Sequence, residues 1–487
     1  MSMHVKNKLA QLCRILILIF YIFLCVHIYI YALSHNLKYA LCGIIAAVFF
    51  AFIGVVFAKN IHFETTKSAL FLMIVLCSFV KIYTICFYQP TPVADYNTYY
   101  EFAQQLANGY VLSYNPLYIS IFPHVFGYAE FLSIFYLVFG ASIYIPIIIN
   151  VILSIISLIL IFSIADIIKG QQFAICCSCL WIIFPSQSLW NGFILSEPLY
   201  VTELLLFWYL ALHLQKNKEP SRKSYILALL SGIVLILFNM SRPVGIIVLF
   251  ALFIWFILMD INNVNKHRIC LLLLIAAVYF VGCFLANKHI ESRIGYKTGG
   301  FSWYNVSVGL NESSNGTWNQ EDWDLLLTKV NEYAQSGSAN PAYDVQMLSK
   351  KRALTKLKSI HHPLILVHNK LDILFGDDSA VIEHMKASNV PFDEAAYNHL
   401  YLLVNSFYYL LIVFSFYGGY IILIKEKSSG LTFIILYSIG LTLGHVLVEV
   451  QGRYHYSILL GFIFVAGYGM SSLVSKFCAN ISFKTSY

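Results

Sequence analysis

Apolar runs of about 20 residues recur along the whole chain, and short polar connections separate them. Each run is long enough to cross the roughly 30 Å hydrocarbon core of a bilayer. The chain is 59% hydrophobic and only 11% charged, whereas soluble domains carry roughly 25% charged residues. We therefore predict an all-α polytopic membrane protein. About twelve spans are expected, near residues 13–34, 38–58, 68–88, 142–165, 173–190, 198–215, 224–240, 243–260, 267–287, 398–424, 430–450 and 456–475.

Basic residues gather in the connections on one side of these spans, which by the positive-inside rule is the cytoplasmic side. On the other side, the short connections contain only Lys38, Arg242 and Arg453. We therefore expect a plasma-membrane protein with both termini in the cytoplasm. The same bias accounts for the net charge of +7, so no nucleic-acid partner is implied. The inner basic residues are Lys6, Lys8, Arg14, Lys59, Lys67, Lys169, Lys216, Lys218, Arg222, Lys223, Lys266, Arg268, Lys425, Lys427 and Lys476.

Two regions on the outer side are large, residues 89–141 and 288–397. We interpret the apolar segment 117–139 as amphipathic or re-entrant, because a further span there would reverse the charge bias of every later connection. The second region holds 13 of the 24 acidic residues, and its pattern predicts the short helices of a small external domain. The predicted parts are an N-terminal hairpin (1–66), a main transmembrane module (67–287), the external domain (288–397) and C-terminal helices (398–487).

Charged residues in or beside the spans gather at one level of the membrane. A proton or ion path would need such groups across the whole thickness, so this distribution favours an active site that opens to the outside. The residues at this level are Asp95, Glu101, Glu130, Glu197, Glu203, Glu449, Lys81, Arg242, His445 and Arg453.

Two carboxylates begin predicted helices. Asp95 opens a helix that runs to about Asn108 and stops at Gly109. Its carboxylate fits two roles equally, an N-cap that accepts backbone N–H groups and a catalytic group. Glu197 precedes a proline at the start of a span. It fits either an acid that complements the helix dipole or a polar residue of the site.

Two arginines are candidates for an anionic ligand. Arg242 lies at a sharp outer turn between two spans, where it either snorkels to the interface or binds a ligand. His445, Glu449 and Arg453 recur every four residues, which places them on one helix face and fits a Glu449–Arg453 ion pair. Arg453 is followed by Tyr454, a combination suited to an anionic, sugar-bearing ligand.

Two lysines and a group of histidines complete the candidates. Lys370 lies in a predicted helix near the membrane, where it either contacts a phosphate or is solvated. Lys81 lies in the outer part of its span and is expected to snorkel. The histidines His361, His362 and His368 lack the spacing of a zinc site, so no metal is predicted among them.

The order of several short motifs is characteristic. The first outer region contains Asp95-Tyr96-x-x-Tyr99-x-x-x-Ala103-x-x-Leu106-x-x-Gly109, followed by Phe122-Pro123-His124 and Phe139-Gly140. Ser196-Glu197-Pro198, Ser241-Arg242-Pro243, the loop Val308-Gly309-Leu310-Asn311 and Arg453-Tyr454 come later. In these features the chain resembles the GT-C superfamily of membrane glycosyltransferases. It is most similar to the bacterial branch related to glycosyltransferase family 39, which includes the protein O-mannosyltransferases and the lipid A aminoarabinose transferase.

The resemblance implies a GT-C-like bundle with outer juxtamembrane helices. It also implies an inverting enzyme, embedded in membrane lipid, that moves a sugar from a polyprenyl-phosphate carrier to a glycan or glycolipid acceptor. Relatives often carry a second acid near the first, and Asp95-Tyr96-Asn97 offers only one. The resemblance therefore does not establish a metal requirement; no cofactor is predicted, and a divalent cation stays an open alternative. The implied roles are a base for Asp95, donor or phosphate binding for Arg242, Arg453, Lys370 and Tyr454, and acceptor or polar-site contacts for Glu197, Tyr99, His124 and Glu449.

Two other functions compete with this interpretation. A polysaccharide polymerase or ligase with a diphosphate-linked donor would also have a large outer loop, but it should carry more arginines there. Residues 89–141 contain none. A transporter or flippase should place charges near the midplane and on both sides of the membrane, which this chain does not.

Overall fold

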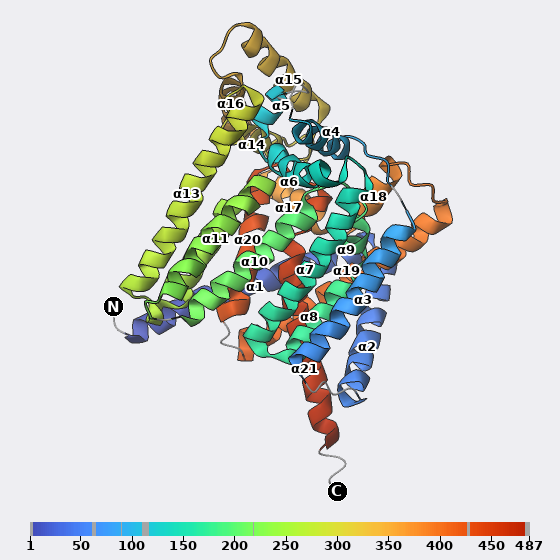
Figure 1. Ribbon diagram of the computed structural model, residues 1–487. Helices are drawn as coiled ribbons and strands as arrows, with labels where there is room; N and C mark the ends of the chain where they lie inside the picture. Colours follow the sequence, from blue (N-terminus) through green and yellow to red (C-terminus); the bar gives the residue numbers. More distant parts are fainter. Residues whose placement is uncertain are drawn as a thin grey trace.

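The computed structural model describes residues 3–60, 65–88, 90–109, 116–217, 219–425 and 429–482, which fold into a bundle of helices (Figure 1). Among these residues, nine helices are long and apolar enough to cross a membrane. The predicted all-α polytopic fold is therefore confirmed. The nine helices are α1 (Met3–His35), α2 (Leu37–Asn60), α3 (Thr66–Cys86), α7 (Tyr144–Lys169), α11 (Arg222–Ser241), α13 (Lys266–Ile294), α19 (Glu394–Lys425), α20 (Ser429–Leu447) and α21 (Ile458–Ser482).

The three other predicted spans are also helical, but they are not among these nine helices. Residues 173–190 form α8 (Gln171–Ile183) and α9 (Pro185–Trp190), because Pro185 holds the preceding Phe184 in an extended conformation. Residues 243–260 form α12 (Gly245–Ile254), which continues into a π-helical turn. Residues 198–215 form α10 (Glu197–Lys216).

A cap of short helices covers one end of the bundle, and α1 begins and α21 ends away from it (Figure 1). The segment 117–139 belongs to this cap and is not a span, as predicted. It forms α5 and α6, and the 16 residues of α6 reach only about 24 Å, short of the hydrocarbon thickness. The cap helices are α4 (Asp95–Ala107), α5 (Pro116–Ile121), α6 (His124–Phe139), α14 (Trp303–Gly309), α15 (Gln320–Gln335), α16 (Pro341–Ser359), α17 (Pro363–Phe375) and α18 (Ala380–Ala387).

The bundle is built around the contact between α19 and α21. A Cβ atom on Gly418 would lie 2.0 Å from the carbonyl oxygen of Val465, and one on Gly469 would lie 2.5 Å from that of Phe414. Small residues at such crossings let helix backbones approach closely in a membrane. Helices α1 and α2 pack against α19 and the last helices of the chain. The domain boundaries at residues 66, 287 and 397 stay predictions.

Lys81 on α3 is fully buried, so the expectation that it snorkels is wrong. Its ammonium group points into the bundle, where it donates a hydrogen bond to the Ser188 hydroxyl at 2.8 Å and lies 5.2 Å from the centre of the Trp181 ring. A hydroxyl and an aromatic ring thus stabilise the charge in place of interfacial water.

Candidate active site

Two adjoining cavities lie where the cap meets the bundle. The membrane-side cavity, about 350 Å³, is lined by the cap-side ends of α11, α13 and α20, by the turn at residues 242–244, and by residues 121–124, 300–302 and Asn305. The loop-side cavity, about 680 Å³, is lined by α4, the loop before α6, the external region and the segment after α20. The two cavities therefore form one continuous site. The residues that line both are Phe122, His124, Arg242, Asn305, Glu449 and Tyr454.

Asp95 lies in the wall of the loop-side cavity. It is the first residue of α4 and not the N-cap, so the capping interpretation is wrong. The cap position belongs to Ala94, whose φ of 46° is a strained conformation for a residue with a Cβ atom. Such strain persists only where the surroundings enforce it, and it often marks functional sites. The residue that follows Ala94, Asp95, contacts Arg453.

Asp95 forms an ion pair with Arg453, with 2.8 Å between Oδ2 and Nη2. The Asp95 side chain is 50% exposed, and its other oxygen, Oδ1, has no hydrogen bond to any described residue. Partial burial would raise the pKa of Asp95, but the Arg453 guanidinium outweighs this effect and lowers it. The carboxylate is therefore charged at neutral pH and has one oxygen free to accept a proton or hydrogen bond.

Arg453 and Glu449 do not pair with each other. Helix α20 ends at Leu447, and Arg453 lies in a separate 3₁₀ turn, Gly452–His455. The shared helix face predicted for His445, Glu449 and Arg453 is therefore wrong. The Glu449 carboxylate instead accepts hydrogen bonds from Gln451 at 2.7 Å and from the Tyr454 hydroxyl at 3.3 Å. Burial raises the pKa of Glu449 above its usual range.

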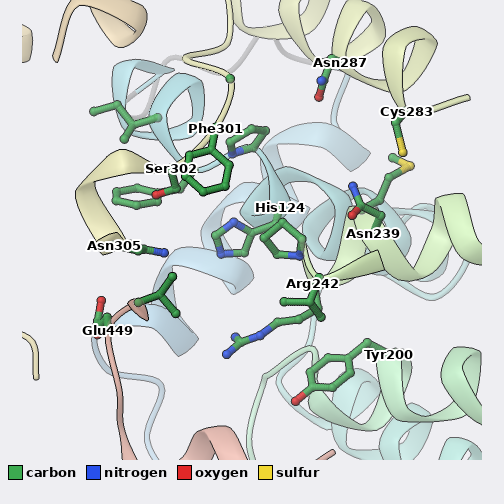
Figure 2. A pocket seen from close by; sticks show the side chains of 18 of the residues that line it. His124, Tyr200, Asn239, Arg242, Cys283, Asn287, Phe301, Ser302, Asn305 and Glu449 are labelled. Atoms are coloured by element: carbon green, nitrogen blue, oxygen red, sulfur yellow. The ribbon is translucent and has the colours of Figure 1, made fainter. Parts of the chain in front are cut away.

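Arg242 lies at the junction of the two cavities and ends α11 as its C-cap residue. Figure 2 shows its side chain reaching into the membrane-side cavity near His124 and Tyr200. The guanidinium lies 4.7 Å from the centre of the Tyr454 ring and 5.8 Å from that of Tyr200. No described residue forms a hydrogen bond or ion pair with it. A half-buried guanidinium that faces a cavity without an anionic partner is suited to bind an anionic ligand.

The other predicted polar-site residues surround this junction. His124 lines both cavities, and burial together with the nearby Arg242 lowers its pKa to about 4, so the imidazole is neutral at pH 7. Tyr99 lines the loop-side cavity and packs edge-on against Tyr128, with 4.9 Å between the ring centres. Glu197 is buried behind the site and lines neither cavity, but its charge acts on both Arg242 and Arg453.

Lys370 on α17 is 2% exposed and lines neither cavity. Its ammonium group donates hydrogen bonds to the carbonyl oxygens of Gly309, Val446 and Val448 at 2.8–2.9 Å. All three protons are used, so none remains for a phosphate. We therefore do not retain Lys370 as a donor ligand. It is a positioning residue, because it fixes the backbone just before Glu449.

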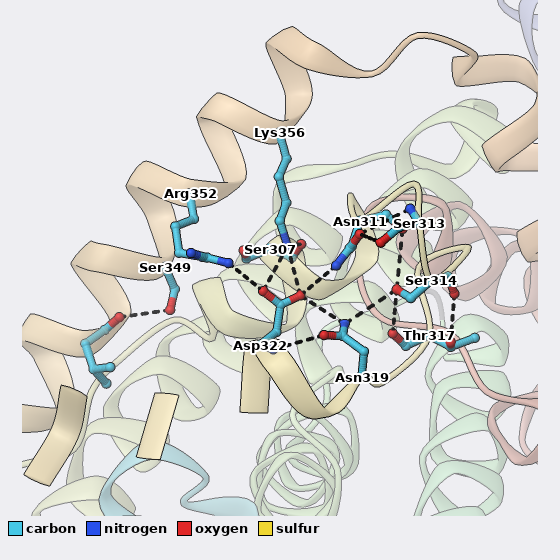
Figure 3. Close-up of polar contacts among 11 residues, drawn as sticks. Ser307, Asn311, Ser313, Ser314, Thr317, Asn319, Asp322, Ser349, Arg352 and Lys356 are labelled. Atoms are coloured by element: carbon cyan, nitrogen blue, oxygen red, sulfur yellow. Dashed lines mark hydrogen bonds and ion pairs between the residues drawn. The ribbon is translucent and has the colours of Figure 1, made fainter. Parts of the chain in front are cut away.

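An aromatic wall lines part of the loop-side cavity, with Trp318, Trp323 and Tyr118 among its residues. Asp322, which is buried, holds the loop that carries Trp318 (Figure 3). Its carboxylate forms ion pairs with Arg352 and Lys356, each at 2.9 Å. It also accepts hydrogen bonds from the side chains of Asn311 and Asn319, at the two ends of that loop.

We expect Asp322→Asn to loosen this loop and to destabilise the external region by about 2 kcal/mol. This value is below the usual cost of breaking a fully buried ion pair, because Arg352 and Lys356 are partly exposed. Burial would raise the pKa of Asp322, but the bonds from Lys356 and the asparagines lower it to about 2. A lowered pKa means that the stabilisation is present above pH ~4 and is lost as the pH falls through about 2. Hydrogen exchange of residues 309–323 measures both effects. Asp324→Asn, an exposed neighbour on α15, is the matched control, and equal exchange in the two variants would contradict the prediction.

No protein-family model matches the chain, and no curated protein matches it by sequence. Solved structures do match. The archaeal oligosaccharyltransferase AglB from Archaeoglobus fulgidus, in complex with an inhibitory peptide and a dolichol-phosphate, aligns with 88% of this chain at a TM-score of 0.50 and 12% identity. An oligosaccharyltransferase of the same organism in its apo form aligns with 86% at a TM-score of 0.51 and 13% identity. The chain has the GT-C fold.

The similarity to these GT-C proteins is one of fold. The chain spans about half of their length, 52% in both alignments. ArnT from Cupriavidus metallidurans, bound to undecaprenyl phosphate, aligns with 82% of this chain and 78% of its own length, at 12% identity and a TM-score of 0.35.

The residues around Asp95 do not provide an evident metal site. Arg453 occupies one carboxylate oxygen. In the described part of the chain, no three His, Cys, Asp or Glu side chains converge at this cavity with ligand atoms close enough to share an ion. We therefore derive no step of the chemistry through a metal at this position.

Proposed function

We propose that the protein is an inverting glycosyltransferase that moves a sugar from a polyprenyl-phosphate carrier to an acceptor hydroxyl at the outer face of the membrane. The observation that carries this proposal is the guanidinium of Arg242. It has no ionic partner among the described residues, and it faces the junction of a membrane-side and a loop-side cavity. A lipid-linked phosphate that enters from the bilayer would meet this charge and place its sugar toward Asp95.

The membrane-side cavity has the chemistry expected for the lipid donor. Its lining includes apolar or small residues of α13 and α20 such as Ala286, Ile290 and Leu441. An isoprenoid chain can lie against such surfaces while its phosphate reaches the polar end at Arg242 and Tyr454. The structural neighbour AglB was solved with a dolichol-phosphate, a ligand of the same chemical class.

The loop-side cavity has the chemistry expected for the acceptor. Oδ1 of Asp95 accepts the proton of the acceptor hydroxyl as its oxygen bonds to the anomeric carbon. The bond from that carbon to the phosphate oxygen breaks in the same displacement, and the configuration inverts. The polyprenyl phosphate leaves with the electron pair, and Arg242 stabilises its charge. The aromatic wall with Trp318 suits stacking against sugar rings, so the proposed acceptor is a cell-surface polysaccharide, teichoic acid or glycolipid.

A transfer assay tests this function. Membranes that contain the protein would be incubated with a panel of radiolabelled polyprenyl-phosphate sugars and, separately, with diphosphate-linked sugars. We expect label to move from one monophosphate donor to a glycan or glycolipid. Transfer from diphosphate donors alone would favour a polymerase or ligase. Uptake of label into sealed vesicles without any new glycosidic bond would favour a transporter.

The proposal requires the cap to face the outside of the cell. Soluble activated sugars are present only in the cytoplasm, so a transfer on the outer face needs a lipid-linked donor. In a cysteine-free background, cysteines at Asn108, Ser313 and Ala387 should react with an impermeant thiol reagent in intact cells. Cysteines at Lys223 and Lys266, at the opposite end of the bundle, should react only after permeabilisation. The reverse pattern would place the cavities in the cytoplasm and contradict the proposed function.

A further inference from the structure

His27, His368 and Asp372 converge away from the candidate active site. His27 lies on α1, while His368 and Asp372 lie one turn apart on α17. His27 Nε2 is 3.0 Å from one Asp372 oxygen, and His368 Nε2 is 3.5 Å from the other. One ligand atom from each residue lies within 4.8 Å of the other two. The geometry points to a binding site for one Zn²⁺ ion that links α1 to α17.

Two features distinguish this cluster from an ordinary ion pair. His27 Nε2 and Asp372 Oδ1 are both buried, and neither has a well-formed hydrogen bond to any described residue despite their short separation. A metal cation bound between the imidazole and the carboxylate would give both buried atoms a partner. The two imidazole rings also meet edge to face, 5.2 Å apart, an arrangement in which two imidazolium charges would repel each other.

The ligand set selects the ion. Imidazole nitrogens favour zinc and similar transition metals, whereas Mg²⁺ and Ca²⁺ prefer oxygen ligands alone. In a tetrahedral zinc site with bonds of about 2.0 Å, ligand atoms lie roughly 3.3 Å apart. The distances of 3.0 and 3.5 Å, each to a different Asp372 oxygen, are close to this value. His368 is 61% exposed, and its open side leaves room for a water molecule as the fourth ligand.

The location gives such an ion a role. Helix α17 carries Lys370, which fixes the backbone before Glu449. It also carries Leu374, whose carbonyl oxygen lies 2.6 Å from His455 Nδ1. His455 ends the 3₁₀ turn that contains Arg453. Gly376, just after α17, packs so closely on Tyr31 of α1 that a Cβ atom would lie 2.6 Å from its ring. A zinc ion at the cluster would therefore hold α17, and through it the charged wall of the loop-side cavity, against α1.

Metal binding can be measured without any assay of activity. The full-length protein in detergent would be stripped with EDTA and dialysed against micromolar ZnCl₂. Zinc per chain would then be determined by mass spectrometry, and the unfolding temperature recorded with and without zinc. We expect about one ion per chain and a higher unfolding temperature with zinc. His368→Ala and Asp372→Asn should each weaken zinc binding roughly tenfold or more and abolish the thermal shift.

His361→Ala provides the matched control, because His361 is an exposed histidine just before the same helix and lies outside the cluster. It should bind zinc like the unmodified protein. The high exposure of His368 means that its alanine variant should fold normally, which gel filtration checks. Absence of zinc from the unmodified protein, or equal zinc in the unmodified protein and His368→Ala, would overturn the proposal. Neither result depends on whether the protein transfers sugars.

Discussion

Asp95→Asn should reduce sugar transfer by roughly 10²- to 10⁴-fold, the range that general-base catalysis contributes. The amide keeps the shape of the side chain and can still accept a hydrogen bond from Arg453, but it cannot take a proton from the acceptor. Expression and unfolding temperature should change little, because Asp95 is 50% exposed and does not cap α4. Initial rates with saturating donor measure the effect. Glu101→Gln on the same helix does not alter the cavity lining and should retain activity.

The pH profile separates a base from a residue that only positions the substrate. Arg453 lowers the pKa of Asp95, so the carboxylate stays charged and the rate should fall only below pH ~4, the usual value for an aspartate. Arg453→Gln removes the opposing charge and leaves the effect of burial, which raises the pKa. The acid limb of the profile should therefore move to higher pH in that variant. Near-normal turnover by Asp95→Asn, or an acid limb that does not move, would reject the assignment.

Arg242→Gln should raise the KM for the lipid donor by about 10- to 100-fold, since a hydrogen bond to a charged group contributes about 1.5–3 kcal/mol. If the guanidinium also stabilises the charge on the departing phosphate, kcat should fall as well. The KM of Arg242→Lys should lie between those of the unmodified protein and Arg242→Gln, because lysine keeps the charge but lacks the planar guanidinium group. Donor titrations in detergent measure both constants.

The control for this change lies on the same helix. Arg222 begins α11 at the opposite end from Arg242 and is exposed, so Arg222→Gln alters the charge of the helix without touching the site. It should leave the donor KM unchanged. An unchanged KM in Arg242→Gln, or a donor complex whose phosphate lies far from the guanidinium, would remove Arg242 from the binding site.

The sequence predicts the position of a site residue well where that position depends on the local pattern of apolar and polar residues. Asp95 begins a helix that stops at Gly109, and Arg242 lies at a turn between two apolar runs, as predicted. Hydropathy and charge bias also indicated that the segment 117–139 is not a further span, and it forms the short helices α5 and α6. These features depend on neighbours in the chain, so a single sequence contains the information.

What the sequence could not provide depends on contacts between distant segments. The four-residue spacing of Glu449 and Arg453 suggested one helix, but nothing in that spacing reveals that α20 ends at Leu447. In the sequence, Lys81 and Lys370 cannot be distinguished from lysines at the membrane interface. Only the fold shows which carbonyl or hydroxyl groups surround their ammonium groups. Likewise, the sequence around His368 shows no zinc spacing, because the histidine that lies beside it, His27, belongs to a helix near the other end of the chain.

The two cavities share six lining residues and differ in the rest. One is also lined by the ends of α11, α13 and α20, and the other by the start of α4 and by Trp318 and Trp323. Under the proposed function, we expect the lipid donor and the acceptor to arrive by different routes, so that neither needs to leave before the other enters. The proposed function therefore predicts a ternary complex and a sequential rate law, with intersecting lines in double-reciprocal plots. It also allows the spent carrier to diffuse back into the bilayer while the elongated product departs on the aqueous side.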